Sequence, residues 1–406
     1  MLLREPFERS EYVSEGQSMN WNAGIEMRLG WLLCLVVSAC GAAEKPVVAE
    51  TEKAAPAVAP KEGSANGSGS GNAAAPEPVV PAAPAAPVLN ALGSNEPLNE
   101  ATRKLVWETT EDDAPEVLNA TRKDLENRHY LTCDELHLAK FYPNLKGIKG
   151  AYIGVGSDQA YTVMGWMDAE LAWLTDYDPW IKQEHRIYAL FFEKAETPEA
   201  FVSQWRIRNR VASRAMIAER FADDPAKAMI LEVFDAAIYK VDVRMTRLLA
   251  MAKNYKIPTF VSDAAMYNHV RQMVLGGRVR PMVSNLLDTD GLKGVGDASR
   301  AVNVPIRAVY MSNAEDYWPY SDQFRLNMAG LNFDENSWIL RTAASKRTNG
   351  DYRYNMQDAI NFQAWLKEPY VKRRGDIWPA PYVNGEDDVP MQVLDTAPFD
   401  RRAKRK

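Results

Sequence analysis

The sequence contains few cysteines and few histidines, and this limits its metal and redox chemistry. Three cysteines (Cys34, Cys40 and Cys133) and four histidines occur among 406 residues. Cys133 is the only cysteine beyond residue 40, so we expect no disulfide within the chain after that point. His129, Cys133 and His137 recur every four residues. On a helix the outer two would lie about 12 Å apart. That is too far for one zinc ion with bonds of about 2 Å, so no metal site is predicted.

The sequence also lacks an excess of positive charge. Lys and Arg total 48 against 54 Asp and Glu, which gives a formal net charge of -6. A chain with this balance does not attract a polyanion over its whole surface. We therefore exclude nucleic acid as a partner, and we interpret the short basic end at residues 401–406 as a solvated terminus.

The apolar run at residues 29–37 is too short to cross a membrane, because a spanning helix needs about 20 residues. It follows Arg28 and leads into the sequence VSAC at residues 37–40, with the proportions of a secretory signal peptide. These four residues resemble the lipobox of bacterial lipoproteins. The resemblance implies that residues 27–39 are a lipoprotein signal peptide. It also implies that lipid on Cys40 anchors the chain to a cell membrane or outer membrane, facing the periplasm or the exterior.

The sequence on either side of this signal divides the rest of the chain. Residues 1–26 are polar and acidic, so we expect translation to start at Met27 and residues 1–26 to be a non-native extension. Residues 40–95 are dominated by Ala, Pro, Gly and Ser. Such a segment buries too little apolar area to offset its chain entropy, so it is predicted to be a disordered linker. Residues 96–406 are predicted to form the folded domain.

Apolar strands alternate with helices through the folded part. Such alternation is typical of an α/β domain with a mainly parallel sheet covered on both faces. Strands are predicted near residues 150–154, 171–178, 257–263, 279–285, 306–313 and 337–342. Helices are predicted at residues 115–128, 160–166, 264–275 and 297–302, with a long helical insert at 179–256 whose aromatic residues belong to the core. Residues 346–406 are expected to form an irregular arm packed on the domain.

A glycine turn follows the first strand and precedes a helix. Such a turn presents backbone N–H groups to an anionic or polar ligand, although glycines also simply make tight turns. Asp176 ends the next strand, about 20 residues beyond the glycines, where nucleotide-binding crossovers place a carboxylate on ribose hydroxyls. The residues of the glycine turn are Gly154, Gly156, Ser157, Asp158 and Gln159.

Right-handed crossovers place the loops after parallel strands at one edge of the sheet. The strings YIGVGSDQ, LTDYD and YMSNAEDYW resemble the class I methyltransferase fold, and more narrowly a bacterial family with a methyltransferase-like core. The resemblance implies a Rossmann-like three-layer sandwich and S-adenosylmethionine as cofactor. It assigns cofactor binding to the glycine turn, to Asp176 or Asp178 and to Asn285. It assigns the catalytic positions beside the transferred methyl group to Asn313, Glu315 and Asp316.

Three functions are compatible with these observations. The first is a binding or scaffold module of the envelope, whose pocket is empty or takes another nucleoside-like ligand. The second is an active methyltransferase, and the third is a hydrolase built on Ser157, Asp158 and a histidine. The histidines show no spacing that favours the hydrolase. The donor S-adenosylmethionine is made in the cytoplasm, whereas the lipobox implies export, so we favour the module.

Overall fold

A computed structural model describes residues 90, 96–344, 351–379 and 391–400. The predictions for residues 1–26, for residues 27–39, for Cys40 and for nearly all of the linker 40–95 lie outside the described residues, as does the basic end. Every helix, strand, contact and unpaired group named for this fold lies within the described residues.

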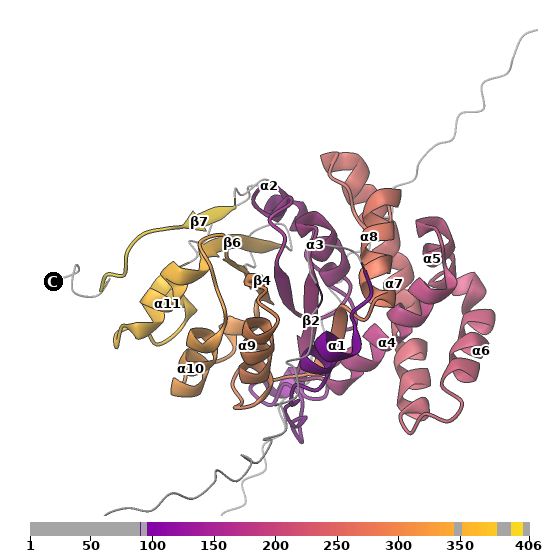
Figure 1. The fold of residues 1–406 in the computed structure, drawn as a ribbon, viewed down its shortest axis with the longest axis horizontal. Helices are drawn as coiled ribbons and strands as arrows, with labels where there is room; N and C mark the ends of the chain where they lie inside the picture. Colours follow the sequence, from indigo (N-terminus) through magenta and orange to yellow (C-terminus); the bar gives the residue numbers. More distant parts are fainter. Residues whose placement is uncertain (1–89, 91–95, 345–350, 380–390, 401–406) are drawn as a thin grey trace, which may run out of the picture. The chain divides into compact units, whose positions relative to one another are not determined.

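A seven-stranded sheet in the order β3-β2-β1-β4-β5-β6-β7 forms the centre of the domain (Figure 1). The five strands from β3 to β5 are parallel, β6 runs antiparallel to β5, and β7 runs parallel to β6. The order reverses direction between β1 and β4, which is the switch point where Rossmann-like sheets bind ligands. The strands are β1 (Ala151–Val155), β2 (Leu171–Asp176), β3 (Val279–Val283), β4 (Ile306–Ser312), β5 (Trp338–Ala344), β6 (Tyr352–Asp358) and β7 (Gln392–Leu394).

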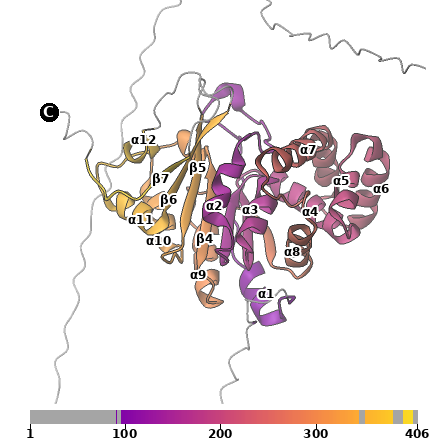
Figure 2. The ribbon, with the colours of Figure 1, turned by 90° about the horizontal axis from the view of Figure 1, so that it is seen from above.

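Helices cover both faces of the sheet (Figure 2), each face burying its own apolar cluster. One face is covered by α2 (Tyr142–Leu145), α3 (Gln159–Met167), α4 (Pro179–Lys194) and α8 (Ala264–Leu275). The other is covered by α1 (Glu100–Trp107), α9 (Gly291–Ala301), α10 (Asp322–Gly330) and α11 (Ala359–Lys367). The predicted Rossmann-like three-layer α/β sandwich is confirmed.

The predicted helical insert between β2 and β3 is also confirmed. After α4 it contains α5 (Pro198–Gln204), a 3-10 helix (Ile207–Asn209), α6 (Arg210–Arg220) and α7 (Lys227–Tyr255). The aromatic side chains Phe191, Phe192, Trp205 and Phe234 are fully buried and stack on one another and on their neighbours, as expected of core residues.

The strand predicted at residues 257–263 is wrong. The segment is a turn in which the Ser262 hydroxyl accepts the Thr259 N–H at 2.8 Å, and Asp263 caps α8 through the Met266 N–H. Phe260 and Val261 are buried, so a buried turn produces the same apolar run as a buried strand.

The helix predicted at residues 115–128 is wrong as well. The segment is irregular apart from a 3-10 turn at Lys123–Leu125, because Asn119 and Asn127 both adopt a left-handed conformation with φ 55°. Leu118 and Leu125 are nevertheless buried, so the apolar spacing reflects core contacts made by a non-helical chain.

The stretch after residue 346 is not an irregular arm where the structure describes it. It supplies the sheet strands β6 and β7 and the helices α11 and α12 (Arg374–Ile377). Trp365 and Trp378 are buried, and Trp365 belongs to the apolar cluster on the α9 face. These residues complete the domain.

Candidate functional site

The structure places the glycine turn beside the end of β2, at the carboxyl edge of the sheet. The Gly156 N–H lies against the Asp176 carboxylate, and the Thr175 hydroxyl donates to the Gly154 carbonyl at 3.3 Å. Beneath the turn, Nε2 of His185 lies 2.9 Å from the Gly156 carbonyl oxygen. The glycine turn and Asp176 therefore lie side by side, as the sequence predicted.

The two acids after β2 have different surroundings. Asp176 accepts the Asp178 N–H at 2.9 Å, and burial raises the pKa of Asp176 to about 7, against the lowering effect of these N–H groups. Asp178 caps α4 by accepting the Trp180 N–H and lies 2.8 Å from Nδ1 of His129. Burial raises the pKa of Asp178, although the His129 contact opposes the shift. Asp176 is therefore the acid that is better placed to meet a ligand hydroxyl.

The two glycines make room for side chains of the protein itself. A Cβ at Gly154 would lie 2.4 Å from the hydroxyl of Tyr152. Gly156 has φ +91°, and a Cβ there would lie 2.9 Å from Nε2 of Gln159. That amide donates to the Val155 carbonyl at 2.7 Å. Contacts within the protein are therefore sufficient to explain why glycine occupies both positions, and no ligand is needed.

A mostly irregular segment runs along the carboxyl edge from the end of β2 to β6, and we call residues 115–141 the edge strap. Near β2, Oδ1 of Asn119 accepts the Tyr177 hydroxyl at 2.6 Å, and His129 stacks on Trp180 at 3.8 Å. Near β6, the Leu136 N–H donates to Asp351 at 3.1 Å, and the His137 N–H donates to Tyr354 at 2.9 Å. The strap therefore passes over the strands on which a ligand was predicted to sit.

Glu135 is the central residue of the edge strap. Its carboxylate accepts hydrogen bonds from the hydroxyls of Ser312 at 2.9 Å and Thr342 at 3.0 Å, and from the hydroxyl of Tyr310. The side chain is 1% exposed. Burial raises the pKa of Glu135, while these hydroxyl bonds oppose the shift. The ends of β4 and β5 are thus bonded to the strap.

A buried ion pair lies beside Glu135. Nε of Arg244, from α7, donates to Oδ2 of Asp158 at 2.7 Å, with the two side chains 4% and 0% exposed. Oδ1 of Asp158 accepts the Cys133 N–H at 2.9 Å, and Arg244 also donates to the Glu135 carbonyl at 3.2 Å. Burial by itself lowers the pKa of Arg244, but the groups around the guanidinium, with Asp158 foremost, together outweigh burial and the pKa is raised. Both oxygens of Asp158 are engaged within the protein, and Ser157 and Gln159 beside it are buried.

The remaining predicted site residues lie in separate environments. The Asn285 N–H donates to Asp112 at 3.0 Å in the loop after β3. Glu315 is buried against Arg341 at 3.1 Å, and Asp316 pairs with Arg374 at 2.6 Å. The Asn313 amide reaches the Tyr317 hydroxyl at 3.5 Å. The structure therefore ties the predicted catalytic acids to arginines.

Sequence reasoning missed Glu135, Arg244 and the edge strap. The only signal was the repeat of His129, Cys133 and His137, and the structure separates these residues: His129 meets Asp178 and His137 meets Asp351. Among the residues described, no group of three or more His, Cys, Asp or Glu side chains is arranged to hold a metal ion. No described helix has the length and apolar character to span a membrane.

Residues 130–388 match the family described as "Domain of unknown function (DUF7790)". The chain belongs to this family. The match begins inside the edge strap and extends beyond α12, so Glu135, Asp158 and Arg244 all lie within the family domain. No curated protein matches the chain.

Proposed function

We propose that this DUF7790 chain is a lipid-anchored binding or scaffold module of the cell envelope that transfers no methyl group. The observation that carries the proposal is the position of Glu135. Ligands of Rossmann-like sheets bind outside the carboxyl ends of the strands at the switch point, here between β1 and β4. The edge strap occupies this position, with Glu135 bonded to β4 and β5.

The surroundings of the predicted catalytic residues support the same proposal. A catalytic acid or base has to come within hydrogen-bond reach of the reacting group. Glu315 is 2% exposed and paired with Arg341, and Asp316 is held by Arg374. Both carboxylates are paired with arginines in this arrangement.

An active S-adenosylmethionine-dependent methyltransferase is the alternative, because Asp176 lies beside Gly156. Calorimetry of the full chain with S-adenosylmethionine and S-adenosylhomocysteine separates the two functions. We expect no heat of binding at ligand concentrations up to about 1 mM, the upper end of ordinary cofactor and substrate affinities. Micromolar binding that is lost in Asp176→Asn but kept in Asp322→Asn, an exposed acid on α10, would establish the nucleoside site.

The anchoring half of the proposal depends on residues 37–40. Mass spectrometry of the mature protein should find Cys40 as a lipid-modified first residue, and Cys40→Ser should leave the chain unlipidated and released by washing. Recovery of peptides from residues 5–26 on the mature protein would contradict both the signal peptide and the start at Met27.

A further inference from the structure

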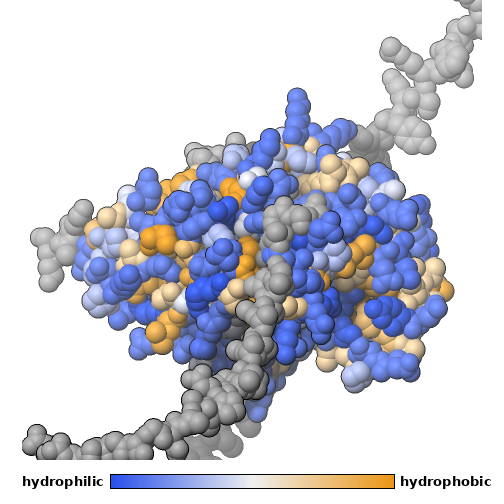
Figure 3. Space-filling model, viewed as in Figure 1, coloured by the Kyte–Doolittle hydropathy of each residue, from blue (hydrophilic) through white to orange (hydrophobic). Residues whose placement is uncertain are grey.

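The face of the protein in Figure 3 is mostly hydrophilic, and its apolar residues form small separate patches. On a face without a large apolar patch, a recess is the first place to look for a binding site. A recess of about 820 Å³ lies along the outer edge of β3. Its volume is within the usual range for ligand sites.

The recess is a trough along α4. Its floor is one stripe of that helix, from Lys182 through Arg186 and Ala189 to Glu193. One wall is formed by residues 219–225, and the other by β3 with the end of α1. The stripe is about 16 Å long at 1.5 Å per residue, which matches about five residues of extended chain at 3.3 Å each.

The backbone of β3 faces this trough. The Arg278 carbonyl accepts the Ala172 N–H, and the Ser284 N–H donates to the Asp176 carbonyl, both at 2.9 Å. The backbone N–H and carbonyl groups of the even-numbered residues of β3 therefore bond to β2. Those of the odd-numbered residues point away from β2, toward the outer edge of the sheet. No group in the described part of the chain pairs with the N–H or carbonyl of Val279 or with the carbonyl of Pro281.

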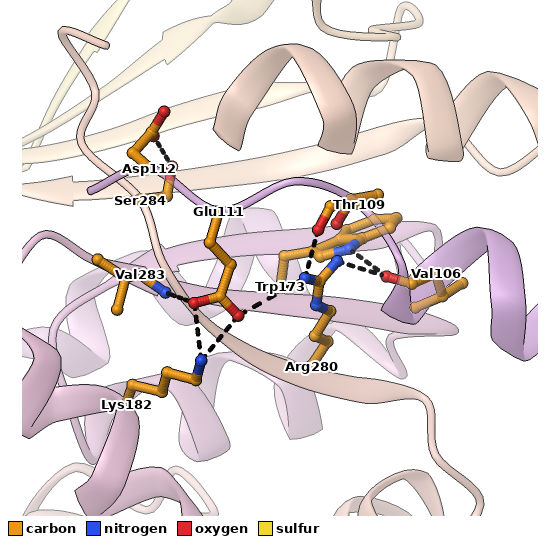
Figure 4. Close-up of polar contacts among 9 residues, drawn as sticks. All are labelled: Val106, Thr109, Glu111, Asp112, Trp173, Lys182, Arg280, Val283 and Ser284. Carbon is orange, nitrogen blue, oxygen red and sulfur yellow. Dashed lines mark hydrogen bonds and ion pairs between the residues drawn. The ribbon is translucent and has the colours of Figure 1, made fainter. Parts of the chain in front are cut away.

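One end of the same edge is already closed (Figure 4). The Val283 N–H donates to Glu111 at 3.1 Å, and the Val283 carbonyl accepts the Asp112 N–H at 3.1 Å. Lys182 donates to both oxygens of Glu111, at 2.8 and 2.7 Å. Between the two ends of this edge, Val279 and Pro281 line the recess.

The lining carries charges of both signs around an apolar middle. Arg186 pairs with Asp224 across the trough, while Leu190 and Leu275 belong to its apolar surface. Trp107 stands at the β3 wall, fixed by a 2.6 Å bond from its indole N–H to the Gly277 carbonyl. Such a lining attracts neither a polyanion nor a polycation but suits a peptide of mixed charge.

We propose that this trough binds a short extended peptide of mixed charge, which adds to the outer edge of β3. The peptide would donate two N–H groups, to the carbonyls of Val279 and Pro281, and accept one from Val279. Its side chains would alternate between the apolar floor and the charged rim. The proposal depends neither on lipid at Cys40 nor on a ligand at the carboxyl edge.

Phage display of random heptapeptides on the immobilised full chain, counter-selected on Ala189→Trp, tests the trough. Ala189 lies on the floor, so a tryptophan there fills the trough, whereas Ala212→Trp on the exposed side of α6 is the matched control. We expect enriched peptides to lose at least tenfold in affinity for Ala189→Trp and to bind Ala212→Trp like the unmodified chain, as measured by calorimetry.

A backbone test distinguishes strand addition from other binding. N-methylation of alternate peptide amides should weaken binding about tenfold, because it removes the donors to Val279 and Pro281 without changing side chains. Val279→Pro should weaken peptide binding several-fold. If Ala189→Trp does not fold, the N-methylated peptide and Val279→Pro together still test the proposal. Failure of any peptide to enrich over the counter-selection, or equal binding of the methylated peptide, would overturn the proposal.

Discussion

The carboxyl edge of the sheet and the outer edge of β3 differ in how their polar groups are satisfied. At the carboxyl edge, Asp158 and Glu135 bond to residues that belong to other parts of the chain. At β3, the outward backbone groups of Val279 face an 820 Å³ recess. Polar groups that are buried and paired stabilise a fold, whereas open ones at a recess are available to a partner. The comparison indicates that Asp158 and Glu135 serve the fold at the edge where other Rossmann-like proteins bind ligands.

The largest effect should come from the buried pair at the carboxyl edge. Arg244→Met is expected to lower the free energy of unfolding by about 3–5 kcal/mol, because it leaves Asp158 buried without its counterion. The control is Arg206→Met, since Arg206 pairs with Asp242 at 2.6 Å with a 26% exposed side chain. That variant should cost about 1 kcal/mol or less. Urea denaturation measures the free energy of unfolding of both variants. Equal losses would show that the buried pair contributes no more to stability than the partly exposed one.

A somewhat smaller loss is expected from Glu135. Glu135→Ala leaves the hydroxyls of Ser312 and Thr342 without their acceptor, which should cost about 2–4 kcal/mol. Glu135→Gln keeps an acceptor oxygen and should cost less. Hydrogen exchange provides the second readout, because a released strap should exchange the Leu136 and His137 amides faster. Unchanged exchange in Glu135→Ala would mean that Glu135 does not hold the strap.

The pH dependence of stability should identify Asp176. Its pKa is raised to about 7 from 3.8, so between these pH values the Asp176 carboxyl group binds more protons in the folded chain than in the unfolded chain. Stability from this group is therefore present at low pH and falls as the pH rises through about 7. Asp176→Asn should flatten the decrease in melting temperature between pH 4 and pH 7, while Asp322→Asn should not. A parallel decrease in both variants would place the titrating group elsewhere.

The elements that sequence predicted well depend on local signals. β2 and β4 are largely apolar, as buried parallel strands are, and α8 begins directly after its capping residue Asp263. The turn at 257–263 was misread because a buried turn needs apolar residues as much as a buried strand does. Local composition reports burial more directly than it reports backbone shape.

The candidate site could be predicted only in part. Gly156 and Asp176 are linked by one crossover, so their spacing in the sequence was sufficient to bring them together. Glu135 bonds to Ser312 and Thr342 across 177 and 207 residues of chain, and nothing in the intervening sequence encodes that pairing. The apolar spacing in the first part of the edge strap indicated a helix at residues 115–128, whereas the chain there is mostly irregular, so its course along the sheet was not predicted.

The smallest effect tests the wall of the trough. Trp107→Phe removes the donor to the Gly277 carbonyl while keeping most of the ring, so we expect a loss of about 0.5–1.5 kcal/mol in the free energy of unfolding. Trp318→Phe is the matched control, because the Trp318 indole N–H is buried without a partner among the described residues; its removal should be neutral or slightly stabilising. If both variants lose the same amount in urea denaturation, the Trp107 bond does not fix the wall.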